Sequence, residues 1–359
     1  MNDLFSTTTK NPMPISTYSA KDIEVLEGLE PVRKRPGMYI GGTDERALHH
    51  LVAEILDNSM DEAVAGYASQ IEIEILPENI VVIKDNGRGI PIEEHPKFPG
   101  KSALEVITTI LHSGGKFNNK VYHTSGGLHG VGLSVVNALS DHLVIEVIKE
   151  KKLYRQTYSK GHPQTKIEYI SDIKQKNGTN ILFHPDPEIF GNLTFNPKTL
   201  YELAKSKAYL YSGVKIKWHC HSDLITESSP FPIDDLFHFP HGLEDFLNLH
   251  LNNKQTIIPT IFTGSTTLSE HHAKVEWTIS FLDDNETFLH SYCNTIPTIE
   301  GGTHEQGLRS ALLKGIKEYG ELTGNKKISN ITFEDISNNL VGVLSLFIHD
   351  PQFQGQTKE

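Results

Sequence analysis

Residues 51–63 read Leu-Val-Ala-Glu-Ile-Leu-Asp-Asn-Ser-Met-Asp-Glu-Ala, and the spacing of their polar side chains is the first guide to the fold. Glu54, Asp57, Asn58 and Asp61 follow steps of three, one and three, which place all four on one narrow stripe of an α-helix. The apolar residues between them fall on the opposite side and can enter a core. A solvent-facing helix normally interleaves Lys or Arg to relieve repulsion between carboxylates, but this window contains neither. The stripe therefore indicates an external cation and a carboxylate free for proton transfer, or else an ordinary acidic surface helix.

Length and composition limit the protein class. A chain of 359 residues predicts two domains, and a composition that is 37% hydrophobic and 22% charged is typical of a soluble globular protein. The sequence has no run of eighteen apolar residues, so no membrane span is expected, and its start does not resemble a signal peptide. Only two cysteines occur, Cys220 and Cys293, which argues against a disulfide framework. We expect a reducing, cytoplasmic location.

Charge and histidine content narrow the possible ligands. A formal net charge of −12 argues against a broad nucleic-acid surface on this chain, although a local basic patch stays possible. The 19 histidines are scattered and lack a two-plus-one ligand spacing, which favours surface histidines over a zinc site.

Periodicity divides the chain into three parts. Residues 1–17 are polar and predict a flexible arm, 18–239 an αβ region, and 240–359 a second region that follows a composition shift near 222–242. Strict alternation predicts a strand at 71–75, and two helices facing an antiparallel sheet favour an α+β chain whose first domain is an α/β sandwich. The other predicted strands are 80–83, 143–148, 167–170, 180–183, 275–282, 288–292 and 340–348, and the predicted helices are 103–111, the segment after Gly132, and 304–319.

Three glycine-bearing segments follow the acidic helix. Asp85 ends a predicted strand and opens the run Asp-Asn-Gly-Arg-Gly-Ile-Pro, where glycines would let the backbone turn close to a flat ligand, although a plain turn has the same pattern. Lys116 follows two glycines in a loop that lacks the hydroxyl residue of a Walker A motif. Residues 125–132 form a Gly-rich loop that enters a helix, an arrangement that suits phosphate but also a hinge. Together, the segments predict an ATP site built without a P-loop.

The same segments resemble a known family. Residues 54–63, 85–91 and 125–132 are similar to the three ATP motifs of the GHKL family. Residues 30–40 (Glu-Pro-Val-Arg-Lys-Arg-Pro-Gly-Met-Tyr-Ile), 301–304 and 350–358 narrow the resemblance to the B subunits of bacterial type IIA topoisomerases. Within that family, Ile-Pro-Thr at 296–298 and Asp-Pro-Gln-Phe at 350–353 resemble the topoisomerase IV branch more than the gyrase branch, and the choice between the branches stays open. The resemblance implies a GHKL (Bergerat) α/β sandwich followed by a smaller α+β transducer domain.

The resemblance also implies roles for individual residues, with ATP and Mg²⁺ as ligands. Glu54 matches the general base, Asn58 the Mg²⁺ ligand and Asp85 the carboxylate that reads adenine, while Asp57 and Asp61 are left to local hydrogen bonding. Lys358 matches a lysine that reaches the γ-phosphate from the second domain. The other residues matched to the nucleotide site are Tyr18, Arg88, Gly89, Pro91, Lys116, Tyr122, Gly126, Gly127, Leu128, His129, Gly130, Val131, Gly132, Thr179 and Gln356, with Arg155 at its rim.

Partners follow from the same resemblance. It implies an ATP-dependent homodimer, in which Tyr18 and the arm reach across to the second copy, and double-stranded DNA passed through the clamp. It also implies an A-type subunit that carries the cleavage tyrosine, because no cleavage region is seen in this chain. Arg309 and Lys317, eight apart on one helix, either face the DNA cavity or form a solvated face. The alternatives are gyrase B, a GHKL chaperone or mismatch-repair ATPase, and a non-catalytic nucleotide-binding module. A sensor histidine kinase is not expected, because it would need a helix pair before the ATP-binding domain and no such helices are predicted before residue 18.

Overall fold

The computed structural model describes residues 19–117, 124–127, 129–225, 231–252, 254–268, 273–283, 286–354 and 358. The predicted arm at 1–17 lies outside these ranges, as do Tyr18, Tyr122, Leu128 and Gln356.

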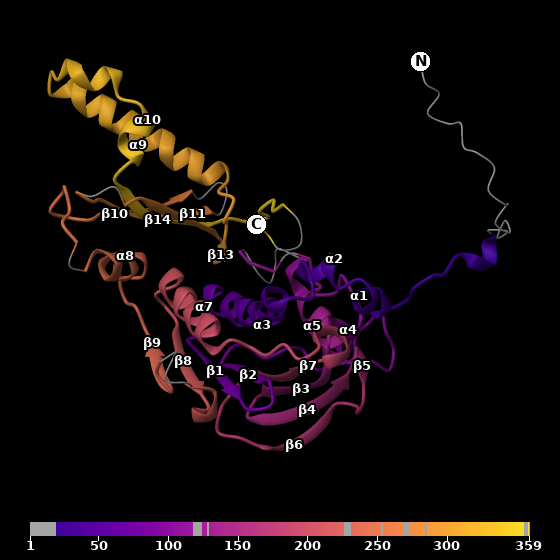
Figure 1. Ribbon diagram of the computed structural model, residues 1–359. Helices are drawn as coiled ribbons and strands as arrows, with labels where there is room; N and C mark the ends of the chain where they lie inside the picture. The colour runs from indigo at the N-terminus through magenta and orange to yellow at the C-terminus, as the bar shows by residue number, and fades with distance from the viewer. Residues whose placement is uncertain are drawn as a thin grey trace, which may run out of the picture.

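A nine-stranded sheet forms the base of the molecule in Figure 1, with strand order β5-β4-β3-β7-β2-β1-β8-β9 and β6 paired to β4. The sheet is mixed, because β1 and β8 run parallel while the other pairs are antiparallel. The expectation of an antiparallel sheet is therefore wrong at this pairing, since the chain reaches β8 through a helix rather than through a hairpin. The strands are β1 (Gln70–Leu76), β2 (Ile80–Asp85), β3 (Ser140–Lys149), β4 (Lys152–Ser159), β5 (His162–Pro163), β6 (Glu168–Asp172), β7 (Gly178–Pro185), β8 (Lys215–Cys220) and β9 (Asp234–Phe237).

Helices cover one face of this sheet (Figure 1). The central one, α3 (Glu45–Val64), begins where the Asp44 side chain accepts a hydrogen bond from Ala47 N. Its apolar side joins one core with the alternating buried residues of β1 and the continuous buried run of β2, and each large side chain removed from water there contributes about 1.5–3 kcal/mol. The others are α1 (Glu30–Lys34), α2 (Gly37–Ile40), α4 (Ala103–Thr109), α5 (Gly132–Ala138), α6 (Pro187–Phe190) and α7 (Pro197–Leu210), with 3₁₀ turns η1 (Ala20–Asp22), η2 (Gly115–Phe117) and η3 (Ser222–Leu224).

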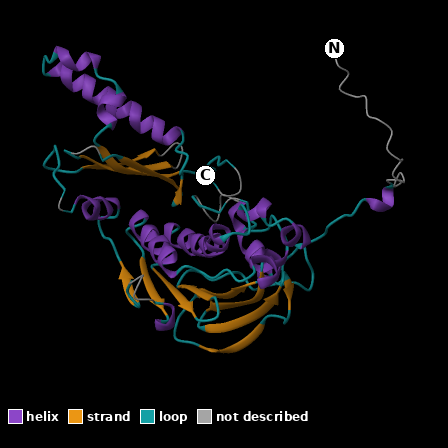
Figure 2. Ribbon diagram, viewed as in Figure 1, coloured by secondary structure: helices purple, strands orange, loops and turns teal. Residues whose placement is uncertain are grey.

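A second, five-stranded sheet follows, in the order β10-β11-β14-β12-β13, with β12 and β14 parallel. Figure 2 shows helices on both sides of it, with the long helix α9 on the side away from the first sheet. The elements are α8 (Leu243–Leu251), β10 (Phe262–Leu268), β11 (Ala273–Phe281), β12 (Phe288–Cys293), β13 (Ile296–Pro297), α9 (Thr303–Leu322), η5 (Lys326–Asn330), α10 (Phe333–Ser337) and β14 (Leu340–Phe347). Among the described helices, none has both the length and the apolar character to cross a bilayer.

The two sheets with their helices confirm the predicted α+β class. All the predicted strands and helices are present with boundaries shifted by a few residues. The elements that were not predicted are β4, β5, β8, β9, β10, β13, α1, α2, α6, α7, α8 and α10. α9 differs from a core helix, because Gly320 is the one residue of it that is buried and Tyr319 is 66% exposed.

Candidate active site

Glu54 lies in the middle of α3 and faces two nitrogen groups. Its Oε1 is 3.3 Å from Nε2 of His50, one turn earlier, and 3.2 Å from Nζ of Lys358. Burial alone would raise the pKa of Glu54, but the Lys358 ammonium and the His50 ring hold it well below its usual range. The sequence-predicted base and the sequence-predicted lysine therefore meet, and Glu54 is ionised.

The other residues of the stripe also have cationic neighbours. Lys207 Nζ of α7 lies 2.6 Å from Asp57, and Lys116 Nζ lies 2.6 Å from Asp61 and 2.5 Å from Asn58 Oδ1. The expectation that only an external cation balances the stripe is wrong, because these lysines come from segments distant in the sequence. Asn58, the predicted metal ligand, has its amide oxygen bonded to an ammonium in this structure.

Backbone groups of the Gly-rich loop converge on the same stripe. The N–H groups of Gly126 and Gly127 donate to the Asp61 carboxylate at 2.7 and 3.4 Å. A Cβ at Gly132, the first residue of α5, would lie 2.1 Å from Glu54 Oε2. A side chain at this position would therefore displace the Glu54 carboxylate or move α5 away from it.

The remaining described loop residues lie next to this contact. Gly130 accepts a hydrogen bond from Ser113 N, and Val131 is the N-cap of α5. Burial and the Lys358 charge lower the pKa of His129 below its usual value.

Asp85 ends β2 as a buried carboxylate. Its oxygens accept hydrogen bonds from Gly87 N at 2.8 Å and Ser59 Oγ at 3.2 Å, and Thr179 stands opposite it on β7. Burial, aided by the charge of Glu62, raises the pKa of Asp85 to about 7, and the two donors only partly offset it. A carboxyl that titrates near neutrality at the end of a strand is typical of a functional group.

Glycines surround Asp85 where a side chain would collide. A Cβ at Gly178 would lie 2.3 Å from the Asp85 carbonyl oxygen, and Gly89, with φ of +74°, has the Ile148 carbonyl oxygen at 2.8 Å from its Cβ position. Arg88 pairs with Glu62 at 2.6 Å and lies over the Tyr67 ring at 3.8 Å.

Two predicted rim residues are exposed. Pro91 follows this turn at the surface, while the exposed Arg155 pairs with Glu146 at 2.6 Å. Arg309 on α9 pairs with Glu305 and lies over Phe333, so it is held within its own region.

Some residues of the site were not predicted. Ser59 and Glu62 belong to the helix quoted first, but their contacts with Asp85 and Arg88 require the fold. Lys207 had no signal in the sequence, because nothing local distinguishes a buried lysine from a solvated one. No cluster of three or more His, Cys, Asp or Glu side chains suited to a metal occurs in the described ranges.

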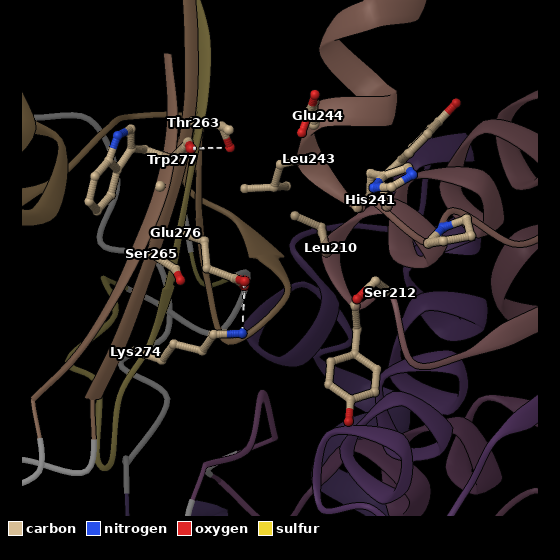
Figure 3. Close-up of a pocket in the computed structure, with 15 residues that line it drawn as sticks. Leu210, Ser212, His241, Leu243, Glu244, Thr263, Ser265, Lys274, Glu276 and Trp277 are labelled. Carbon is tan, nitrogen blue, oxygen red and sulfur yellow. Dashed lines mark hydrogen bonds and ion pairs between the residues drawn. The ribbon is translucent and has the colours of Figure 1, made fainter. Parts of the chain in front are cut away.

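A separate cavity of about 300 Å³ lies between the end of α7 and strands β10 and β11. Figure 3 shows Leu210, Ser212 and His241 on one side and the ion pair of Lys274 with Glu276, 2.7 Å long, on the other. None of the predicted site residues lines it. The candidate active site is therefore the group of residues around α3 and not this cavity.

The comparison with protein families assigns both parts of the chain. Residues 43–188 match the family described as "Histidine kinase-, DNA gyrase B-, and HSP90-like ATPase", and residues 242–359 match "DNA gyrase B". The fold and the site thus define a GHKL-type ATPase.

Comparison with individual proteins narrows the family further. The chain is 59% identical over 363 aligned residues to the B subunit of DNA topoisomerase 4 from Rickettsia felis, covering 100% of this chain and 54% of that protein. It is 42% identical to the B subunit of DNA gyrase from Chlamydia pneumoniae, covering 95% of this chain and 43% of that protein. The solved topoisomerase IV ATP-binding domain of Francisella tularensis, in complex with a small-molecule inhibitor, matches with a TM-score of 0.73 and 34% identity, covering 93% of this chain and 86% of that chain.

The chain belongs to the family of bacterial type IIA topoisomerase B subunits and represents their ATPase region, with higher identity to the topoisomerase IV branch than to the gyrase protein. It spans about half the length, 54%, of the Rickettsia felis relative.

Proposed function

We propose that this chain is the ATP-driven clamp of a topoisomerase IV, with Glu54 as the residue that positions and deprotonates the attacking water. One observation carries this proposal: the Glu54 carboxylate lies between the Lys358 ammonium and Gly132 at the start of α5. A side chain there would fill the space beside the carboxylate. The arrangement combines a base, a cation for developing phosphate charge and open backbone.

Adenine recognition falls to Asp85. An exocyclic amine donates to a carboxylate, and Asp85 is held in place by Gly87 and Ser59 while Thr179 flanks it. Arg88, Gly89 and Pro91 form the turn beside it. Glycine at 89 and 178 lets the turn after Asp85 pack tightly on the neighbouring strands, since a side chain at either position would collide with the Ile148 or the Asp85 carbonyl oxygen.

Phosphate binding falls to the loop from Gly126 to Gly132 and to Lys116. Backbone N–H groups and one ammonium suit phosphate oxygens, and both groups contact Asp61 in this structure. The residues fit a triphosphate–Mg²⁺ pair, because the amide oxygen of Asn58 already faces a cation in this structure. Mg²⁺ would neutralise phosphate charge there, with Asn58 as its protein ligand.

Glu54 acts more by position than by basicity. Its depressed pKa makes it a weak base, but phosphoryl transfer needs an oriented water at least as much as a strong base. Lys358, which arrives from the far end of the second sheet, would stabilise the terminal phosphate. Hydrolysis then changes what Lys358 binds, and this links the chemistry to the placement of the second region.

The complete enzyme requires partners that this chain does not contain. We propose a cytoplasmic assembly in which the arm at 1–17 and Tyr18 join two copies when ATP binds, domain 18–239 holds the nucleotide, and domain 240–359 transmits its state. An A-type subunit with the cleavage tyrosine and double-stranded DNA complete it. In an assembly with that partner and with the regions that the full-length relatives have in addition, decatenation without supercoiling is expected, whereas negative supercoiling would indicate a gyrase.

The direct experiment is steady-state ATP hydrolysis by this chain. We expect turnover with Mg²⁺, loss of turnover with a chelator, and recovery when Mg²⁺ is restored. Hydrolysis that continues in the chelator, or ATP binding with no hydrolysis at any protein concentration, would contradict the proposal.

A further inference from the structure

The turn between β12 and β13 joins parts of the molecule that are far apart in sequence. Its residues Asn294 and Thr295 are both buried and both have positive φ, 49° and 67°. The Thr295 carbonyl oxygen accepts a hydrogen bond from Lys207 Nζ at 2.7 Å, and the Asn294 amide donates to the Ser125 carbonyl oxygen at 2.7 Å. One turn of the second sheet therefore touches α7 and the segment that opens the Gly-rich loop.

Lys207 connects this turn to the acidic helix. The residue is 2% exposed, and its ammonium also lies 2.6 Å from Asp57, the residue before Asn58. Burying an ion pair is costly, and well-packed apolar residues would often stabilise a core equally well. Lys207 therefore fixes the position of α3 relative to the Thr295 carbonyl in a way that apolar packing would not specify.

Asn294 connects the turn to the segment that leads to Lys358. Its amide donates to the Ile348 carbonyl oxygen at 2.9 Å, and its oxygen accepts from Ile348 N at 2.9 Å. Ile348 directly follows β14, and the chain beyond it reaches Glu54 through Lys358. The amide nitrogen and the amide oxygen of Asn294 are thus both hydrogen-bonded, which fixes the orientation of this side chain.

The turn also contacts the loop itself. A Cβ at Gly126 would lie 3.1 Å from the Asn294 carbonyl oxygen and 3.1 Å from the Ile296 side chain. Gly126 N donates to Asp61 on α3. The loop is therefore held between the acidic helix on one side and the β12–β13 turn on the other.

We propose that Lys207 and Asn294 are positioning residues for ATP hydrolysis: through the Asn294–Thr295 turn they set the acidic helix and the Gly-rich loop relative to the segment that delivers Lys358. This inference rests on the proposed function. The inference adds that hydrolysis of the terminal phosphate depends on a buried contact that touches neither Glu54 nor the nucleotide. Adenine binding at Asp85 is expected to be independent of that contact.

The test uses two independent variants of the whole chain. Asp57→Asn with Lys207→Met removes both buried charges together, which avoids leaving one unpaired. Asn294→Ala removes the amide and also places an alanine at a φ of 49°, a strain that the melting temperature registers. Lys205→Met is the matched control, since Lys205 lies on the same helix and its ammonium is 5.9 Å from the Tyr201 ring centroid rather than in an ion pair with α3. Melting temperature, ADP affinity, affinity for a non-hydrolysable ATP analogue, and ATP turnover are measured for each.

We expect both variants to bind ADP within about twofold of the parent and to lose about tenfold or more in turnover, because small misplacements of reacting groups are costly. Their preference for the ATP analogue over ADP should shrink, a split that a purely structural role would not produce. Parent-like turnover in either folded variant overturns the inference, as does an ADP affinity that falls in step with turnover, or a Lys205→Met protein with the same loss. If the double variant does not fold, Asn294→Ala alone decides. A parent that fails to hydrolyse ATP instead overturns the proposed function.

Discussion

The Lys358 ammonium lies 3.2 Å from the Glu54 carboxylate, although the two residues are 304 positions apart. Both side chains are largely buried, and Asp57 and Asp61 add to the field at the lysine. Burial would lower the pKa of Lys358, but these three carboxylates raise it above its ordinary value. The pair ties residue 358 to the middle of α3.

Replacement of this lysine tests the pair. In Lys358→Met, Glu54 loses the main charge that keeps its pKa low, and the protein is expected to be less stable at pH 7. A folded pKa below the unfolded value gives stability that is present above about pH 4.5 and is lost as the pH falls. The difference in unfolding free energy between parent and variant should therefore be constant from about pH 6 to 9, narrow below pH 4.5, and narrow again as the pH rises past about 10.5. A difference that widens in acid would contradict the assignment.

Replacement of Asp85 by Asn is expected to have opposite effects on ADP affinity and on stability at neutral and higher pH. Because the pKa of Asp85 is raised to about 7, its ionised form is costly to the fold, and its contribution to stability is lost as the pH rises from about 4 to 7. Asp85→Asn should thus gain stability relative to the parent as the pH rises to 8. The same variant should lose ADP affinity by about tenfold or more, since a hydrogen bond to a charged group contributes about 1.5–3 kcal/mol.

The pH profile of the parent provides the internal check. ADP affinity should increase as the pH passes through about 7 in the parent and should be flat in Asp85→Asn. Calorimetric titrations at several pH values measure both. A parent profile that is flat between pH 6 and 8 would show that Asp85 does not receive the adenine amine.

Gly132 is the position where a single methyl group should stop hydrolysis. The added carbon of Gly132→Ala would lie 2.1 Å from Glu54 Oε2, so either α5 or the carboxylate must move. We expect loss of turnover by about 100-fold with destabilisation. Gly315→Ala on α9 is the control, because no atom lies within 4 Å of its Cβ position and Ala stabilises a helix by about 0.5–1 kcal/mol. Equal turnover of the two variants would rule out the close contact.

Arg33 is expected to matter for stability rather than for nucleotide chemistry. It donates to the Ala138 carbonyl oxygen at 2.7 Å and pairs with the buried Asp186 at 2.6 Å, which ties α1 to the end of α5. Arg33→Ala should cost about 2–3 kcal/mol of unfolding free energy, measured with denaturant, because the buried Asp186 carboxylate loses its nearest ionic partner and is left with Lys160 Nζ at 3.7 Å. Lys34→Ala, which breaks an exposed pair with Glu24, should leave stability unchanged. A small effect for Arg33→Ala would mean that solvent replaces the guanidinium.

The acidic stripe shows how far a single sequence reaches. Helical spacing correctly places Glu54, Asp57, Asn58 and Asp61 on one face of α3, because that pattern is local and periodic. Their neighbours are not local: Lys358, Lys207 and Lys116 reach them only after the chain has folded. Residues 51–63 contain no Lys or Arg, but the folded molecule supplies lysines to the stripe from other segments.

The glycine positions show a similar division. The turn after Asp85 and the loop before α5 are recognisable in sequence as places where backbone approaches something closely. Only the folded structure shows that Gly178 meets the backbone of Asp85 and that Gly132 meets Glu54. The parallel pairing of β1 with β8 was missed for a related reason, since strand direction depends on a crossover through α7 that was not predicted.

The most direct test of the proposed mechanism is Glu54→Gln, which keeps the shape of the side chain and removes its charge. ADP affinity and single-turnover ATP hydrolysis are measured on the same preparation, with Glu45→Gln, an exposed residue of the same helix, as the control. We predict retained ADP binding, hydrolysis lower by about 10²-fold or more, and a control at the parent rate. A Glu54→Gln protein that binds ADP and hydrolyses ATP as fast as the parent would contradict the assignment of Glu54 as the base.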